Sequence, residues 1–188
     1  MAGASLGATA GSSADRVGDD ELARAYADET RLRFAFAQHA EGLRQTLVDE
    51  GFVAEDFDFW SLRFDIDEDV EGLDPTTDDR AAGVSTLLDH GEPTAFGMVS
   101  TSSDTHEISL YVQPHRDEAY ALVEPKDGDE RFIVKESEVT PQGCTYKSCS
   151  SECCSTLTSY RYQYDCGSDC RDCVVYRKWC ECEDSSCY

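Results

Sequence analysis

The chain has 188 residues, a formal net charge of −23 and ten cysteines, all of them between residues 144 and 187. This length suits one ordinary domain and a small appendage. Residues 1–140 carry 11 Lys and Arg against 32 Asp and Glu, whereas residues 141–188 carry 5 against 7. Phosphate binding needs a basic face, and none is visible, so the composition argues against nucleic acid as a partner.

The acidic balance is typical of proteins that work in concentrated salt. Only four of the 16 basic residues are lysines, and Asp exceeds Glu. At molar salt the Debye length is about 3 Å, so the repulsion among these charges is screened. The composition therefore predicts a protein of an extreme halophile.

Two interpretations stay open for residues 1–18: a disordered N-terminus, or the remnant of a secretion signal. Residues 1–14 are small, weakly apolar and uncharged. Ala8-Thr9-Ala10 has the small-x-small form that a signal peptidase accepts, but no Lys or Arg precedes it. We expect secretion by a twin-arginine route, with the basic start of the signal missing from this chain. No run of 18 apolar residues occurs, so no membrane span is predicted.

A helical pattern follows up to Glu50. Asp19 and Asp20 are candidate N-caps, and Gly51 suits a C-cap. One helical face gathers the apolar residues Ala25, Leu32, Phe36, Ala40, Leu43 and Leu47. From Phe57 the period changes to alternation as far as Ile66, which predicts a half-buried strand.

The middle of the chain predicts a small sheet. Residues 67–91 are acidic and rich in turn formers. Four strands are predicted next, over residues 94–99, 107–112, 119–123 and 131–134. Residues 139–143 are interpreted as a linker, with Pro141 ending the last strand. The predicted fold class is α+β: an N-terminal helix packed on a small antiparallel sheet, followed by a small disulfide-rich C-terminal module.

No catalytic set is predicted, and we expect a protein that is not an enzyme and needs no cofactor. None of the histidines lies in an HExxH spacing or near a serine elbow. Crowded cysteines are poor catalytic thiols, because oxidation to disulfides would consume them. The histidines are His39, His90, His106 and His115.

The cysteines of the tail, which we define as residues 141–188, have two serious interpretations. Zinc or copper binding needs tetrahedral thiolate sets, usually from CxxC pairs, and only Cys170 and Cys173 have that spacing. The tail also has no histidine and is rich in tyrosine. Five disulfides explain it better than a metal, because its cysteine density is that of small secreted scaffolds. The predicted disulfide residues are Cys144, Cys149, Cys153, Cys154, Cys166, Cys170, Cys173, Cys180, Cys182 and Cys187.

The disulfide pairing stays open at this point, since ten cysteines allow about 945 pairings. The adjacent Cys153 and Cys154 are expected to bond to different partners. Tyr160, Tyr162 and Tyr164 alternate, which predicts a strand with an exposed aromatic face. Together with Trp179 they are our candidates for surface recognition, the alternative being that these tyrosines only cover the disulfide core.

This layout resembles the microhalocin precursors of halophilic archaea. The resemblance rests on the signal-like residues 1–14, on the acidic domain with its hairpin ISLYVQPHRDEAYALVEP, and on the ten cysteines after Gly143. It implies an exported precursor whose ten-cysteine peptide is released by proteolysis and kills related cells. It also implies an N-terminal part that confers immunity by binding that peptide. The better-known peptides are strongly apolar, whereas this tail has no apolar run longer than Val174-Val175-Tyr176.

The sequence therefore predicts three parts. They are a signal-like or disordered N-terminus (1–18), an acidic α+β domain (19–140) and a cysteine-rich peptide module (141–188). We predict a secreted halocin-like antimicrobial precursor, cut between Lys135 and Cys144, whose acidic domain contacts the tail as chaperone or immunity partner. A target-cell surface or membrane would be the outside partner. A thiolate metal-binding protein and a secreted structural or adhesion module stay as alternatives.

Overall fold

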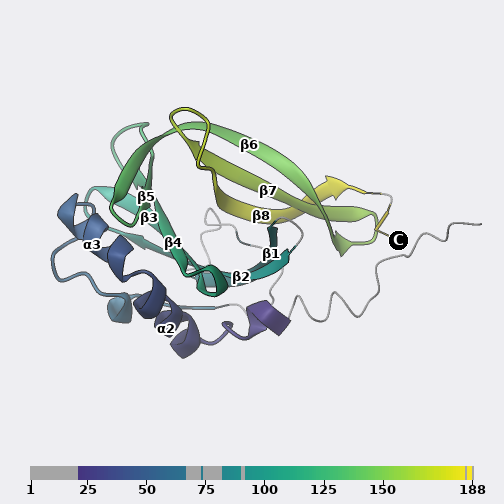
Figure 1. Cartoon of the computed structure of the whole chain (residues 1–188), viewed down its shortest axis with the longest axis horizontal. Coiled ribbons are helices and arrows are strands. Elements are labelled where there is room, and N and C mark those ends of the chain that lie inside the picture. Colours follow the sequence, from purple (N-terminus) through teal and green to yellow (C-terminus); the bar gives the residue numbers. More distant parts are fainter. Residues whose placement is uncertain (1–20, 67–72, 74–81, 90–91, 185, 188) are drawn as a thin grey trace, which may run out of the picture.

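The computed structural model describes residues 21–66, 73, 82–89, 92–184 and 186–187, so the signal-like residues 1–18 lie outside the described residues. The main element is an eight-stranded antiparallel sheet in which each strand pairs with the next along the chain. Figure 1 shows that this sheet curls, so that its last strands lie over its first ones. The strands are β1 (Ala82–Asp89), β2 (Glu92–Ser102), β3 (His106–Gln113), β4 (Glu118–Pro125), β5 (Phe132–Lys135), β6 (Glu138–Ser155), β7 (Thr158–Gly167) and β8 (Val174–Glu183).

The predicted fold class is wrong: the protein is mainly one curled eight-stranded antiparallel sheet with a few short helices, not an N-terminal helix on a small sheet followed by a separate cysteine-rich module. Strand β6 pairs first with β5, where Lys135 lies opposite Glu138, and then with β7, where Cys144 lies opposite Cys166. Residues 139–143, predicted as a linker, are therefore the part of β6 in which the chain passes from one pairing to the other.

A bulge at Gly143 explains how the single strand β6 pairs with both β5 and β7. The register shifts between Gln142 and Cys144, which bends the strand. A Cβ atom added at Gly143 would lie 2.4 Å from Cα of Ser168, so only glycine fits this close approach. Pro141 stands beside the bulge, where a missing backbone N–H is tolerated, and so it does not end the strand.

The predicted N-terminal helix is broken into shorter pieces. Helix α2 spans Glu29–His39 and α3 spans Glu41–Asp49, with a break at Ala40, whose φ is −119°. The N-cap of α2 is Asp28, whose carboxylate accepts a hydrogen bond from the backbone N–H of Arg31 at 3.1 Å. Residues 21–24 are helical as well, and there are two short 3-10 helices, η1 (Phe59–Ser61) and η2 (Pro114–Arg116).

The strand predicted over residues 57–66 is also wrong. The alternating side chains of Leu62 and Phe64 are buried as predicted, but their backbone is irregular and follows η1. The guanidinium of Arg33 donates hydrogen bonds to the carbonyls of Trp60 and Leu62, the second at 3.1 Å. A side chain thus satisfies backbone groups that a neighbouring strand would otherwise pair.

The four predicted strands between residues 94 and 134 are confirmed as β2 to β5, each longer than predicted or shifted by one residue. A fifth, β1, lies inside the acidic segment that we predicted to be turns. It begins at Ala82 and pairs along its whole length with β2. Four of its eight residues are apolar, but they do not alternate along the whole strand, so the turn formers around it dominate the sequence pattern.

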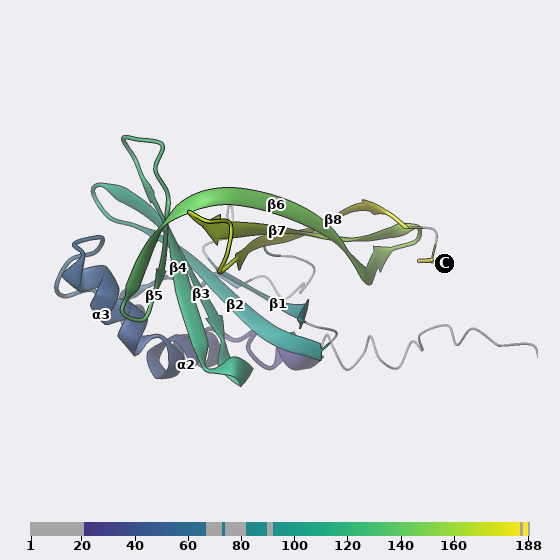
Figure 2. The ribbon, with the colours of Figure 1, turned by 45° about the horizontal axis from the view of Figure 1, so that its top comes forward.

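The front sheet, which we define as β1 to β5, is covered on both faces. Its first face packs on α2 and α3 around Phe36, Leu43 and Leu47, and the strands contribute the alternating Ile108, Leu110 and Val112. Its second face packs under β7 and β8 of the tail (Figure 2). The molecule therefore has three layers, in the order helices, front sheet and tail.

Candidate functional site: the interface between the front sheet and the tail

Aromatic side chains fill the interface between the front sheet and the tail. Tyr160 and Tyr162 of the tail are 8% and 3% exposed, and they belong to one buried cluster with Tyr111 and Tyr120 of the front sheet. The rings of Tyr111 and Tyr120 stack with centroids 4.8 Å apart. Other members of the cluster are Leu73, Leu87, Phe96, Met98, Leu122, Ile133 and Val174.

The four residues that the sequence suggested for surface recognition therefore separate. In the docked tail, Tyr160 and Tyr162 are core residues, and the prediction that they form an exposed aromatic face is wrong for this conformation. Tyr164 is half-buried at the edge of the same layer and stacks on Tyr146 with centroids 4.6 Å apart. Trp179 is half-buried as well, and its strand neighbour Lys178 points to the interface, so Trp179 lies on the opposite face.

Two tyrosine hydroxyls of the front sheet bind the backbone of β8. Tyr111 donates to the carbonyl of Tyr176 at 2.8 Å, and Tyr120 donates to that of Val175 at 2.5 Å. Because β8 is the last strand of the sheet, one of its edges pairs with no named strand of the described residues. These hydroxyls, and a two-way backbone bridge between Leu73 and Lys178, supply hydrogen bonds that an edge strand lacks.

Lys178 is the most unusual residue of the interface, because its charged side chain is only 1% exposed. Its Nζ donates to the carbonyl of Thr86 in β1 at 2.6 Å and to Oε1 of Glu152 in β6 at 2.7 Å. The same Nζ lies 3.9 Å from the centroid of the Tyr160 ring. Oε2 of Glu152 in turn accepts from the hydroxyl of Tyr162 at 2.9 Å. A buried charge is tolerated only with such partners, and they come from three strands, β1, β6 and β7.

Burial also affects the titration of the interface tyrosines. The pKa of Tyr120 is raised well above its ordinary value of 10.0, chiefly because burial disfavours the phenolate. Burial likewise raises the pKa of Tyr176, against the opposing effect of Arg131, whose guanidinium carbon lies 5.7 Å from the centre of that ring. Both hydroxyls therefore stay protonated, and Tyr120 stays a hydrogen-bond donor, at neutral pH.

All ten cysteines form disulfides, so the prediction of a disulfide-rich tail is confirmed. The adjacent Cys153 and Cys154 bond to different partners, as expected. A cysteine in a disulfide cannot act as a thiolate ligand, and in the described part of the chain no group of three His, Cys, Asp or Glu side chains could hold a metal ion. The pairs are Cys144–Cys170, Cys149–Cys182, Cys153–Cys187, Cys154–Cys180 and Cys166–Cys173.

The disulfides also fix the shape of the tail. Two of them, Cys149–Cys182 and Cys154–Cys180, join β6 to β8, although β7 lies between these strands. In a flat sheet the two strands would be about 10 Å apart. Their cysteine Cα atoms are 5.9 and 5.8 Å apart, so the three strands must curl toward one another. All five bridges stay within the tail, and none joins it to the front sheet.

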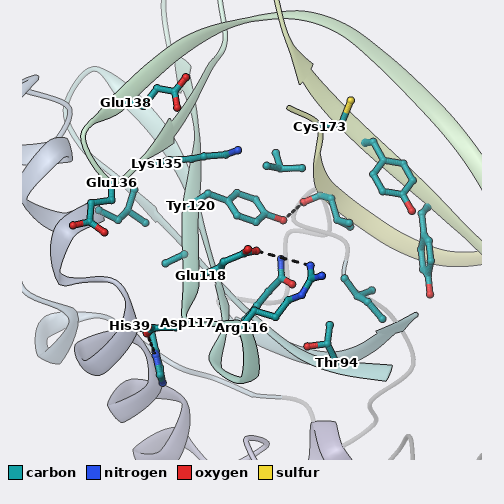
Figure 3. Close-up of a pocket in the computed structure, with 18 residues that line it drawn as sticks. His39, Thr94, Arg116, Asp117, Glu118, Tyr120, Lys135, Glu136, Glu138 and Cys173 are labelled. Atoms are coloured by element: carbon teal, nitrogen blue, oxygen red, sulfur yellow. Dashed lines mark hydrogen bonds and ion pairs between the residues drawn. The ribbon is translucent and has the colours of Figure 1, made fainter. Parts of the chain in front are cut away.

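A cavity of about 400 Å³ opens between the layers (Figure 3). Tyr120 and Lys135 project into it from the front sheet, and Cys173 stands on the tail side. The charged groups around it include an ion pair between Arg116 and Glu118 at 3.9 Å. Because both layers line this cavity, it exists only while the tail is docked on the front sheet.

Of the three histidines that the structure describes, His39 is the one that borders this cavity. Its Nδ1 lies 2.6 Å from Oδ1 of Asp117 at the helix side of the cavity. His106 contacts the Thr105 hydroxyl at 2.8 Å on the far side of the front sheet, where its ring also packs on Phe52. His115 packs edge-on against Tyr26. His90 lies outside the described residues.

The chain was compared with known proteins by sequence and by structure. No family model, curated protein or solved structure matches it. The resemblance to microhalocin precursors therefore stays a prediction, and the site has to be interpreted from its own geometry. One further observation concerns membranes: the described residues include no helix that is long and apolar enough to span a bilayer. The five disulfides, for their part, are compatible with a secreted or extracellular protein.

The residues that carry this interface were missed by sequence reasoning. Lys178 and Glu152 are charged, and a charged residue in a polar tail predicts an exposed position. Tyr111 and Tyr120 lie in strands whose alternation predicted one buried face, and the second buried face is made by a segment more than 30 residues away. The alternation of Tyr160 and Tyr162 did predict that one face of this strand is aromatic. It did not predict that the front sheet covers that face.

Proposed function

We propose that this protein is a secreted, halocin-like precursor in which the front part, residues 19–140, holds an antimicrobial cysteine-rich peptide until proteolysis releases it. The observation that carries the proposal is the distribution of bonds. Every covalent cross-link stays inside residues 144–187, whereas the contacts between the tail and the front sheet are noncovalent. One backbone cut before Cys144 would therefore leave two separable molecules, each in one covalent piece.

The turn between β5 and β6 is the part of the predicted cleavage region that suits a protease best. Glu136, Ser137 and Glu138 are exposed, and Ser137 has a positive φ of 61° that marks a tight turn. Proteases prefer exposed turns, because the backbone there can open locally and enter the active site in an extended form. The rest of the region, up to Cys144, lies in β6 and would first have to leave the sheet.

The front part would act as a chaperone or immunity partner by the contacts described above. It covers Tyr160 and Tyr162, which a free tail would expose, and it satisfies the carbonyls of Val175 and Tyr176. Exposed tyrosines and an unpaired strand edge promote association with other surfaces. In the precursor these groups are occupied, so the activity of the tail would be blocked until release.

Export is part of the proposal, and we propose a twin-arginine route. This route carries proteins that fold before export, which suits a chain whose acidic surface folds in concentrated salt. The disulfides would form where the environment is oxidising. The gene sequence upstream of Met1 tests this point, because an in-frame start followed by an Arg-Arg pair is expected there.

The direct test places the same specific protease site in two exposed turns of the full chain. The first variant carries it at Glu136–Ser137, between β5 and β6. The matched control carries it at Asp127–Gly128, between β4 and β5, so that the cut leaves β5 attached to the tail. After cleavage in molar salt, we expect inhibition of related halophilic cells from the first variant and none from the control.

Mass spectrometry of culture supernatant provides the second half of the test. A natural peptide is expected that begins between residues 136 and 144 and lacks ten hydrogens relative to the reduced sequence, because it holds five disulfides. If the supernatant contains only uncleaved protein and the released tail does not inhibit growth, the proposal is wrong.

A further inference from the structure

The outer face of the tail, which points away from the front sheet, gathers basic side chains around one tryptophan. Side chains alternate across a strand, so Arg161 and Gln163 face away from the interface that Tyr160 and Tyr162 fill. Lys147 lies opposite Gln163 in β6, and Arg177 lies opposite it in β8. Trp179 lies opposite Arg161 in the next row. We name this set the basic face: Lys147, Arg161, Arg177 and Trp179.

The contacts within the basic face hold its cations in fixed places. The guanidinium carbon of Arg177 lies 4.4 Å from the centre of the Trp179 ring, and Nζ of Lys147 lies 5.6 Å from it. Nε of Arg177 donates to Oε1 of Gln163 at 3.2 Å. Arg161 forms an ion pair with Glu181 at 3.3 Å. Three of the five cations of the tail thus stand on one face, where the exposed Glu181 pairs with Arg161.

This concentration of positive charge is unusual in a chain of net charge −23. Salt screens the basic face from carboxylates that lie more than a Debye length away from it. At molar salt the Debye length is about 3 Å, so those carboxylates contribute little to the potential at the basic face. An anion that reaches this face therefore meets its local charge, not the average charge of the protein.

The shape of the basic face decides which anion it fits. Each of the three strands carries one cation. Lys147 and Arg177 lie on either side of Gln163, about 10 Å apart in a flat sheet, and Arg161 lies in the next row. The Cys149–Cys182 disulfide cross-links β6 to β8 and makes the support rigid. Arginine forks bind sulfate and carboxylate groups with paired hydrogen bonds that persist at contact when long-range attraction is screened. A chain of closely spaced anionic groups can meet several of these cations at once.

We propose that the basic face is a binding site for an acidic polysaccharide that carries sulfate or carboxylate groups. A bilayer is the less suitable partner, because surface binding to lipid needs apolar side chains that enter it. The large hydrophobic residues that are exposed in the described chain are Phe34, Trp60, Tyr146 and Leu157, and none of them belongs to the basic face. Trp179 itself is half-buried between two cations.

This site goes beyond the proposed release of the tail. The basic face points away from the front sheet while the tail is docked, so the intact chain binds whether or not any protease cuts it. The proposed function can thus fail while the binding site holds, and the reverse also applies. In a released peptide the same site would direct the tail to the acidic coat of a cell.

The test measures the affinity of the full chain for dextran sulfate and for polygalacturonate in molar KCl. Lys147→Gln combined with Arg177→Gln is expected to raise Kd by about tenfold or more, since each removes a charge-assisted contact. The matched control combines Arg63→Gln with Arg171→Gln, which removes the same charge at positions whose side chains are 82% and 80% exposed. The control is expected to change Kd by less than about twofold.

Three further measurements keep the test decisive. Thermal melting shows whether the variants fold. The single variant Lys147→Gln is measured as well: Lys147 is exposed and lies outside the core, so a loss of affinity in this variant does not come from unfolding. Vesicles of phosphatidylglycerol replace the polysaccharide in a parallel titration, where we expect weaker binding. The inference is overturned if neither polysaccharide binds, if both double variants lose affinity equally, or if the vesicles bind more tightly.

Discussion

The front part and the tail belong to one sheet, yet different forces hold them. The front part contains no cysteine, and its first face buries Phe36, Leu43 and Leu47 in an apolar core. The tail has little apolar surface of its own and is cross-linked by five disulfides. The comparison teaches that cross-links fix the shape of the tail, whereas the front sheet fixes its position.

Reduction of the disulfides is the strongest way to break this comparison. Loss of a native disulfide from a small domain typically costs about 2–5 kcal/mol, and the tail would lose five. We expect β7 and β8 to lose protection from hydrogen exchange after reduction in molar salt, while α2 and α3 keep theirs. Mass spectrometry of exchanged peptides measures both regions at once. Equal loss in the helices would contradict separate origins of stability.

Two large-to-small substitutions compare the two faces of the front sheet. Tyr120→Ala and Phe36→Ala should each lower the free energy of unfolding by about 3–5 kcal/mol, because both remove a buried ring. Their local effects should differ. Tyr120→Ala removes the hydroxyl that binds Val175 and should expose β8 to proteolysis, whereas Phe36→Ala should not. Denaturant unfolding and limited proteolysis of both variants provide the test.

Lys178→Met tests the charged part of the interface. The substitution leaves the Glu152 carboxylate without its cation, and breaking a buried pair costs about 3–5 kcal/mol. We expect the lower end, since the Glu152 side chain keeps 20% of its surface exposed. Adding Glu152→Gln should recover part of the loss, which a double-mutant cycle measures. An additive cycle would show that the two side chains do not interact.

Gly143→Ala sharpens the comparison at the point where the two regions join. The added Cβ would approach Cα of Ser168 to 2.4 Å, and overpacking against backbone costs about 1–3 kcal/mol. Gly51→Ala is a useful comparison, because a Cβ there meets nothing within 4 Å and the cost comes from the positive φ of 73° instead. Thermal unfolding should therefore show the larger loss for Gly143→Ala, with its effect concentrated in β6 and β7.

The smallest effect is a pH dependence that belongs to the interface. Burial raises the pKa of Tyr120 and Tyr176 above their value in the unfolded chain. The stability that they contribute is therefore complete below pH of about 10 and is lost as the pH rises further. Tyr120→Phe should flatten that loss. Denaturant unfolding between pH 9 and pH 11, in molar salt, measures it, and an unchanged profile in the variant would contradict the assignment.

The sequence predicted those elements whose signal is local. Alternation in β3 and β4 predicted strands, because Ile108, Leu110 and Val112 repeat with the period of a pleated strand. The same alternation failed at residues 57–66, where Arg33 satisfies the backbone from another element. Pro141 and Gly143 predicted a break, since the same residues occur in linkers and in bulges. The local sequence does not distinguish these two uses.

By itself, the sequence determined the charge of the front part, the strands β2 to β5 and the disulfide character of the tail, because composition and period do not depend on distant contacts. Only the tertiary structure decided the five pairings and the burial of Tyr160, Tyr162 and Lys178. Those depend on which face of a curled strand meets which neighbour, and a single residue of register at the Gly143 bulge sets that choice.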